Sequence, residues 1–158
     1  MGRSMDKHLK GGDMPSEFVS LTAGGQGYCV DIHAIREIRS WAPVTTLPHS
    51  GPSVLGVMNL RGSVIPIIDL RKKLGLGQTP DAHRNVIVIA SIHARTMGLL
   101  VEAVSEIISV PKEAILPNPT QRTDGETSHI VGLISKDEKM LRVLDIQALI
   151  TQEVEVAA

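Results

Sequence analysis

The sequence has few aromatic side chains and almost no net charge. Phe18, Tyr28 and Trp41 are its aromatic residues, 2% of the chain, and three rings cannot supply the stacking platforms on which single-strand and RNA-binding sheets hold bases. Its 16 Lys and Arg and 17 Asp and Glu leave a formal charge of -1, whereas a nucleic-acid-binding surface must neutralise many phosphates. Both features argue against a nucleic-acid-binding protein.

Cysteine and long apolar runs are also scarce. Cys29 is the only cysteine, so the chain can form no intramolecular disulfide and no cysteine-based zinc site, which suits a reducing compartment. No apolar run approaches the roughly 20 residues of a membrane-spanning helix, and residues 1–13 lack the apolar segment of a secretory signal. These absences predict a cytoplasmic protein without membrane insertion, and residues 1–15 are expected to be a disordered tail.

Residue patterns that would support catalysis or metal binding are missing as well. None of the six histidines lies at metal-ligand spacing from another, and the chain has neither a Gly-x-Ser-x-Gly elbow nor a Walker loop for phosphate. The carboxylate pairs Asp31 with Glu37 and Glu102 with Glu106 have no neighbours that would order them for acid–base chemistry, so solvated surface charge is the simpler interpretation. We therefore expect no catalytic residue, no metal and no cofactor.

The sequence is rich in apolar, β-branched residues. Hydrophobic residues make up 42% of the chain, and Ile and Val favour strands. Short apolar runs are separated by turn residues, so that 23–25 and 61–62 each indicate the turn of a hairpin. Pro66 lacks the N–H that a sheet ladder needs, which predicts a sheet edge or a bulge at that position. The expected strands are 17–22, 26–32, 53–60, 63–68, 85–91, 129–135 and 140–144, and the apolar stretch 97–110 fits helix or strand.

Two short helices are predicted by one capping pattern. Asp69 precedes residues 70–74, whose two leucines share one helix face, and Gly75 follows as a C-cap. Asp145 precedes residues 146–150, where apolar positions again recur at helical spacing. Each aspartate is expected to cap its helix, and replacing Asp69 by Ala should then cost about 1 kcal/mol of stability.

The chain also contains an internal repeat. When Glu37 is aligned with Glu106, identical residues match at six positions. When Gly56 is aligned with Gly132, apolar residues match along the segment that follows. The second alignment has the larger offset, and this change places an insertion in the polar segment 118–128.

The repeat makes residues 97–110 equivalent to residues 28–41, so both are predicted as strand interrupted by a short helical turn, near 32–35 and near 101–104. Each half of the chain would then hold about five short strands, too few for a flat sheet that is stable alone. Closure into a barrel removes strand edges. The sequence thus predicts two small β-barrels, about 17–80 and about 86–150, that share an apolar seam, and it leaves open whether strands are exchanged between them.

One stretch of the sequence is specific to a known family. Residues 56–62, Gly-Val-Met-Asn-Leu-Arg-Gly, and residues 64–70, Val-Ile-Pro-Ile-Ile-Asp-Leu, resemble the signature of the CheW family, the coupling proteins of bacterial chemotaxis. The resemblance covers residues 17–150, and the further segments that carry it are 18–21, 28–32, 35–38, 98–107 and 144–149, together with Pro48.

This resemblance implies a fold and a function. The implied fold is mainly β, with two five-stranded SH3-like barrels around a shared core and a few short helices, as one domain over 16–150 followed by a tail, 151–158. The implied function is that of a non-catalytic adaptor that links the cytoplasmic hairpin tips of methyl-accepting chemoreceptors to the regulatory, CheW-like domain of the histidine kinase CheA. Such an adaptor is cytoplasmic and is recruited to membrane-associated receptor arrays.

Alternatives to this function stay open. Some CheW-like proteins serve surface motility or second-messenger control instead of flagellar control, and the sequence does not choose between these systems. A small-molecule-binding barrel would need a cavity with converging polar groups. A nucleic-acid-binding barrel would need a basic face, which a net charge of -1 argues against.

The resemblance also implies a set of partner-binding positions. They match Ile35, Glu37, Gly56, Arg61 and Gly98. Glu37 and Gly56 recur in the second half, which favours a role in the fold at least as much as a contact, and Ile35 fits a core equally well. Arg61 differs, because Asp137 takes its place in the repeat and a guanidinium fork suits a carboxylate or carbonyl of a partner. Arg61 is therefore the strongest candidate for a partner contact.

Overall fold

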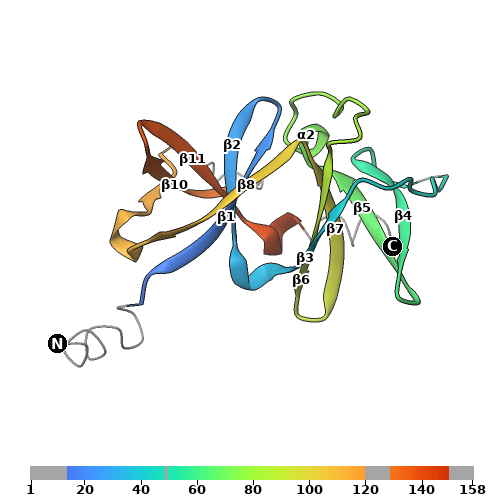
Figure 1. Cartoon of the computed structure of the whole chain (residues 1–158), viewed down its shortest axis with the longest axis horizontal. Coiled ribbons are helices and arrows are strands. Elements are labelled where there is room, and N and C mark those ends of the chain that lie inside the picture. The colour runs from blue at the N-terminus through green and yellow to red at the C-terminus, as the bar shows by residue number, and fades with distance from the viewer. Residues whose placement is uncertain (1–13, 49, 120–128, 150–158) are drawn as a thin grey trace.

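The computed structural model describes residues 14–48, 50–119 and 129–149, and in these residues the protein is mainly β with a few short helices (Figure 1). The strands form two sheets, each the basis of one small barrel. The mainly β fold predicted from the sequence is therefore confirmed. Most of the expected N-terminal tail, the insertion from residue 120 onward and the tail 151–158 lie outside the described residues.

The first barrel is built on a six-stranded sheet with the strand order β8-β1-β2-β11-β10-β9. Neighbouring strands are antiparallel except β2 and β11, which run parallel. In Figure 1 this barrel is the left-hand lobe. Its strands are β1 (Ser16–Ala23), β2 (Gln26–Asp31), β8 (Ala103–Val110), β9 (Leu116–Pro117), β10 (Ile130–Lys136) and β11 (Lys139–Leu144), and the 3-10 helix η3 (Lys112–Ala114) follows β8.

The second barrel is built on a five-stranded sheet with the order β3-β6-β7-β5-β4. Its parallel pair is β5 with β7, and a bridge between Thr45 and Val57 extends the sheet beyond β4. Its strands are β3 (Ile35–Ser40), β4 (Val54–Leu60), β5 (Ser63–Asp69), β6 (Val86–Ile92) and β7 (Arg95–Val101).

The internal repeat is visible in the pairing of the strands. Val19 faces Val30 as Val88 faces Leu99, so the hairpins β1–β2 and β6–β7 keep one register. The hairpins β4–β5 and β10–β11 both carry a bulge, next to Gly56 in one and next to its counterpart Gly132 in the other. The two sheets are therefore two copies of one pattern.

The two halves of the sequence exchange their first hairpins. β1 and β2 lie in the sheet of β8 to β11, whereas β6 and β7 lie in the sheet of β3 to β5. The barrels thus differ from the contiguous segments 17–80 and 86–150, because residues 35–101 form the second barrel and the segments on either side of it form the first. The sequence did not show this exchange, since a hairpin that fits one copy of a repeat also fits the other.

Strand alternation divides the apolar side chains among three buried clusters. Phe18, Cys29, Ile108, Ile134 and Val143 fill the first barrel. Met58, Ile65, Ile67, Ile87, Ile89 and Leu100 fill the second barrel. The largest cluster joins the two barrels and takes side chains from both, among them Leu21, Val30, Val88 and Leu99. This cluster is the apolar seam, and the strands beside it are apolar on both faces because each face is buried.

Both expected short helices are present. Asp69 is the N-cap of α2 (Leu70–Lys73), where its carboxylate accepts the Lys72 N–H at 3.3 Å. Residues 146–149 are helical, and the Asp145 carboxylate accepts the Ala148 N–H at 3.1 Å. Residue 150, the last of the expected helix, lies outside the described residues.

Two local details refine the expectations. The helical turn near 32–35 is the 3-10 helix η2 (Ile32–Ala34), but its expected counterpart near 101–104 is wrong: β7 bends into β8 there, because the Glu102 N–H donates to Thr22 O at 3.0 Å and keeps the chain extended along β1. Pro66 lies in β5 before the pairing with β7 begins at Ile67. At that point β5 has one neighbour, so the missing N–H leaves no gap in the ladder.

Candidate protein-binding site

Three charged side chains, the Arg61 cluster of Glu37, Arg39 and Arg61, meet on the surface of the second barrel. Arg61 Nη2 donates to Glu37 Oε1 at 2.7 Å, and Arg39 Nη1 donates to Glu37 Oε2 at 2.9 Å. The side chain of Glu37 is 23% exposed, against 40% for Arg39 and 71% for Arg61. The cluster therefore holds a shielded carboxylate beside an arginine that a partner can reach.

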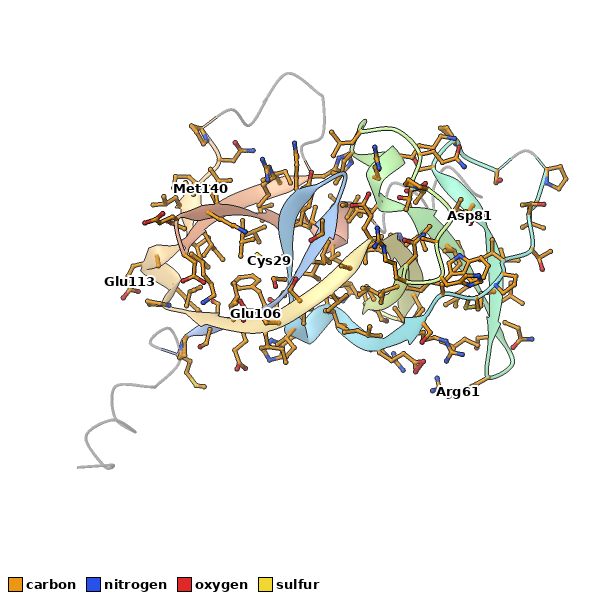
Figure 2. The ribbon with its side chains drawn as sticks, turned by 45° about the horizontal axis from the view of Figure 1, so that its top comes forward. Cys29, Arg61, Asp81, Glu106, Glu113 and Met140 are labelled. Atoms are coloured by element: carbon orange, nitrogen blue, oxygen red, sulfur yellow. The ribbon has the colours of Figure 1, made fainter. Side chains whose placement is uncertain are left out.

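Strand β3 and the tip of the β4–β5 hairpin bring the cluster together. Glu37 and Arg39 share one face of β3, because strand side chains alternate with period two. Arg61 and Gly62 form a two-residue turn with φ of 52° and 90°, in which Asn59 Oδ1 accepts the Gly62 N–H at 2.9 Å. Figure 2 shows Arg61 at the outer end of its lobe, where this turn places it.

The left-handed backbone conformation of Arg61 is required by the hairpin turn and does not indicate a binding role. His93 and Asp137 have φ of 53° and 52° at the same position of two other hairpins. Turns with positive φ at both central residues match the right-handed twist of the flanking strands. What distinguishes Arg61 is therefore its side chain, since Asp137 has the same backbone at the equivalent tip of the first barrel.

The two guanidinium groups keep Glu37 ionised. Hydrogen bonds from Arg39 and then from Arg61 hold the pKa of the Glu37 carboxyl below its ordinary value, and the opposing effect of burial is smaller. The cluster thus carries one negative and two positive charges at neutral pH. A net positive surface of this kind suits a carboxylate or carbonyl group of a partner.

A hollow of about 590 Å³ opens beside the Arg61 cluster. Glu37 and Arg61 supply charge to its lining, and Val64 and Ile65 supply apolar surface. Val64 is 66% exposed, the most exposed large apolar side chain among the described residues. An exposed apolar side chain next to a charged pair is suited to contact with another protein.

The equivalent surface of the first barrel has different charges. A hollow of about 400 Å³ is lined there by Glu106 and Asp137, the counterparts of Glu37 and Arg61. Among the described residues Glu106 has no ion-pair partner, and Asp137 lies 3.8 Å from Lys136. Of the two equivalent hairpins, β4–β5 and β10–β11, only β4–β5 therefore carries an arginine–glutamate bridge at its tip within the described part of the chain.

The structure places the other expected partner-binding residues inside the fold. Ile35 is partly buried against the apolar seam. Gly56 is buried, and a Cβ built there would lie 2.2 Å from the backbone oxygen of Thr45. Gly98 is also buried, and a Cβ there would lie 2.6 Å from Ile67 Cδ1. Both glycines permit close packing, so Glu37 and Arg61 are the members of the set that the structure brings together at the surface.

Sequence reasoning missed two residues of this surface. Arg39 is the second cation on Glu37, and its position two residues further along the same strand was the available signal. Val64 follows the hairpin turn, and nothing in the sequence distinguished it from a core residue, because its exposure depends on the curvature of the barrel.

Sites of other kinds are not evident in the described part of the chain. Within residues 14–48, 50–119 and 129–149, no three His, Cys, Asp or Glu side chains gather as a metal ion would require. None of the helices among these residues is long and apolar enough to cross a membrane.

Comparisons with known proteins place these features in a family. Residues 17–154 match the model of the CheW-like domain. A Rhizobium etli protein named probable chemotaxis protein CheW is 40% identical over 146 residues, which cover 92% of this chain and 93% of that protein. The chemotaxis protein CheW of Rhizobium meliloti is 39% identical, with coverage of 96% and 97%. The solved structure of the scaffolding protein TtCheW from Thermoanaerobacter tengcongensis superimposes with a TM-score of 0.76 at 31% identity and covers 84% of this chain and 90% of that one.

Proposed function

This chain belongs to the CheW family, and we propose that it is the adaptor that couples the cytoplasmic tips of chemoreceptors to the histidine kinase CheA. Its fold is the pair of SH3-like barrels expected for that family. The relatives carry the names of chemotaxis and scaffolding proteins, not of enzymes, so the chain is a non-catalytic chemotaxis scaffold. The proposal adds the identity of its partners, which are the chemoreceptors and CheA.

The observation that carries the proposal is the Arg61 cluster. The cluster lies where the family resemblance implies partner binding, and its Arg61 is exposed and departs from the internal repeat. A residue that both copies of a repeat require serves the fold, whereas Arg61 is present in one copy only. A carboxylate or carbonyl of the receptor hairpin or of the kinase regulatory domain is the complementary group.

The proposed organisation is one CheW-like domain over residues 16–150, with short segments outside it at both ends. Because residues 35–101 are inserted between the two parts of the first barrel, the barrels form one unit. The CheW-like regulatory domain of the kinase can then pack barrel against barrel with this chain. The receptor hairpin recruits the adaptor to the membrane-associated array, without insertion of the adaptor into the membrane.

Reconstitution with purified components tests this function. The full chain is mixed with a full-length CheA homologue, which carries both the regulatory domain and the kinase domain, and with the cytoplasmic fragment of a chemoreceptor from the same genome. We expect a ternary complex on size exclusion, and kinase activity that responds to the receptor only when the chain is present. Absence of binding to every CheA homologue and receptor of the genome would overturn the proposal.

A non-flagellar chemosensory system is the second candidate, and deletion of the gene distinguishes it from flagellar control. Deletion of the gene should abolish swimming responses if flagellar control is served, whereas a loss of surface motility or of second-messenger output with normal swimming would indicate the other system. A small-molecule-binding barrel, the remote alternative, predicts that the chain forms no complex with either protein.

A further inference from the structure

A second hollow, of about 310 Å³, opens at the mouth of the second barrel. It shares no lining residue with the hollow beside the Arg61 cluster. Its floor is formed by Ile67, Ile87 and Leu100, which belong to the buried core of the barrel. The mouths of β-barrels are frequent binding sites for small ligands, and this volume lies at the lower end of the range of ligand pockets, about 300–1,000 Å³.

Trp41 forms one wall of this mouth. Its backbone N–H donates to Asn85 O at 3.1 Å, and its indole meets the His83 ring edge-on with centroids 5.7 Å apart. The indole is therefore held in place beside an apolar floor. Val110 is the counterpart of Trp41 in the alignment that carries Glu37 onto Glu106, so the barrel pattern itself does not require an aromatic ring at this position.

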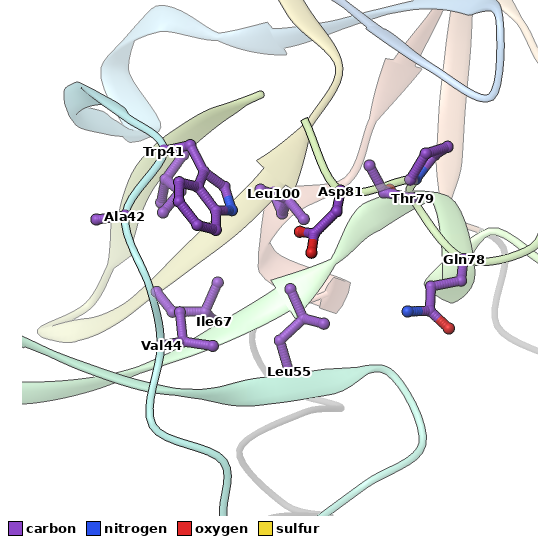
Figure 3. A pocket seen from close by; sticks show the side chains of 11 residues that line it. Trp41, Ala42, Val44, Leu55, Ile67, Gln78, Thr79, Asp81 and Leu100 are labelled. Atoms are coloured by element: carbon purple, nitrogen blue, oxygen red, sulfur yellow. The ribbon is translucent and has the colours of Figure 1, made fainter. Parts of the chain in front are cut away.

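Asp81 lies on the rim of this hollow, on a loop that two hydrogen bonds hold in place. The Thr79 N–H donates to Asp69 Oδ2 at 2.9 Å, and Asn85 Nδ2 donates to Pro80 O at 2.8 Å. The Asp81 carboxylate itself has no hydrogen bond or ion pair with any other residue that the structure describes. Figure 3 shows it turned into the hollow, with Trp41 on one side and Leu55 on the other.

We propose that this pocket binds a guanidinium or primary ammonium group carried on a short aliphatic chain. The cation would lie near the indole face, where it is attracted by the ring electrons. The unpaired Asp81 carboxylate would accept its N–H groups in a charge-assisted hydrogen bond. The methylene groups would contact the apolar floor. Such a group is found on a free aliphatic amine or on an arginine or lysine side chain of a protein.

Titration of the full chain with matched probes tests this pocket. Trp41 is the only tryptophan, so fluorescence under tryptophan-selective excitation comes from one wall of this pocket. Butylguanidinium is compared with its neutral isostere butylurea, and a capped Ala-Arg-Ala peptide with its citrulline analogue. We expect each cation to bind at least tenfold more tightly than its neutral partner. Tighter binding of butylguanidinium indicates a free ligand, and tighter binding of the peptide indicates a protein side chain.

Two charge variants complete the test. Asp81→Asn should weaken binding of both cations at least tenfold with an unchanged melting temperature, because its side chain has no partner to lose. Glu113→Gln removes the same charge from an exposed residue of the first barrel and should leave binding unchanged. Equal binding of cations and isosteres, no saturable signal, or wild-type binding by Asp81→Asn would show the proposal to be wrong. None of these results bears on receptor or kinase coupling.

Discussion

At the scale of single residues, replacement of Arg61 should weaken partner binding and leave the stability of the fold nearly unchanged. An exposed ion pair contributes about 0–1 kcal/mol to stability, so Arg61→Ala should melt close to the wild-type temperature. Loss of a guanidinium from the centre of an interface costs about 2 kcal/mol or more, which is over tenfold in affinity. Thermal melting and receptor–kinase complex formation, measured on one preparation, check both statements.

Arg84→Ala is the matched control for Arg61→Ala. Arg84 is an exposed arginine of the same barrel that does not line the hollow beside the Arg61 cluster. It should change neither melting nor complex formation. If Arg61→Ala melts early but binds normally when folded, Arg61 serves the fold and not the partner.

Glu37 makes the Arg61 cluster sensitive to acid. Since its pKa is lower in the folded protein than in the unfolded chain, its ion pairs stabilise the fold above the unfolded pKa, and this stabilisation is lost as the pH falls through the folded pKa. The difference in melting temperature between wild type and Glu37→Gln should therefore be constant near neutral pH and shrink in acid, below about pH 4. A difference that is independent of pH would contradict this account.

At the scale of elements, Asp69 caps α2 and also binds Thr79 in the loop that follows this helix. Asp69 is fully buried, and its carboxylate also accepts the N–H and the hydroxyl of Thr79, which is 5% exposed. Replacement by Ala would leave these donors buried without a partner, so the expected loss rises from about 1 to about 3 kcal/mol. Asp145→Ala, the counterpart in the repeat, should cost only about 1 kcal/mol. Urea denaturation of both variants measures the two losses in the free energy of unfolding. Equal losses would contradict the additional role of Asp69.

At the scale of the whole molecule, the exchanged hairpins make the barrels interdependent. The apolar seam takes side chains from both barrels. Arg71 Nη1 lies 3.0 Å from Glu102 Oε2, while Glu102 Oε1 accepts the Gly25 N–H at 3.2 Å, so this ion pair connects α2 to the β1–β2 turn. Neither barrel can therefore unfold without exposing the part of the apolar seam that the other barrel contributes.

Because the barrels are interdependent, we expect one unfolding transition, which two independent probes should report alike. Trp41 reports on the second barrel and Cys29 on the first. Cys29 is fully buried, and burial raises its pKa to about 12, so the thiol should react with alkylating reagents only after unfolding. In urea, the fluorescence of Trp41 and the reactivity of Cys29 should change at the same midpoint. Two separate midpoints would show that the barrels unfold independently.

The sequence by itself determined the elements of this protein and its family. Most strand positions, the turn at residues 61–62 and the caps Asp69 and Asp145 follow from local patterns, because alternation, turn chemistry and capping act between residues close in the chain. The strands in residues 97–110 followed only from the internal repeat, since their local pattern fits helix or strand. The motif around Arg61 indicated the family, which the comparisons confirmed. Comparison of the two copies of the repeat marked Arg61 as the residue that departs from it, because Asp137 is its counterpart.

The tertiary structure decided which strands form a barrel and which residues reach solvent. The parallel pairs β2–β11 and β5–β7 join distant segments, and equivalent hairpins compete for the same place, so local patterns could not assign them. The ion pair between Arg61 and Glu37, the burial of Gly98 and the unpaired Asp81 at the barrel mouth depend on the same long-range packing. Exposure is a property of how the sheets curve and meet, and a sequence specifies that only through contacts between residues far apart in the chain.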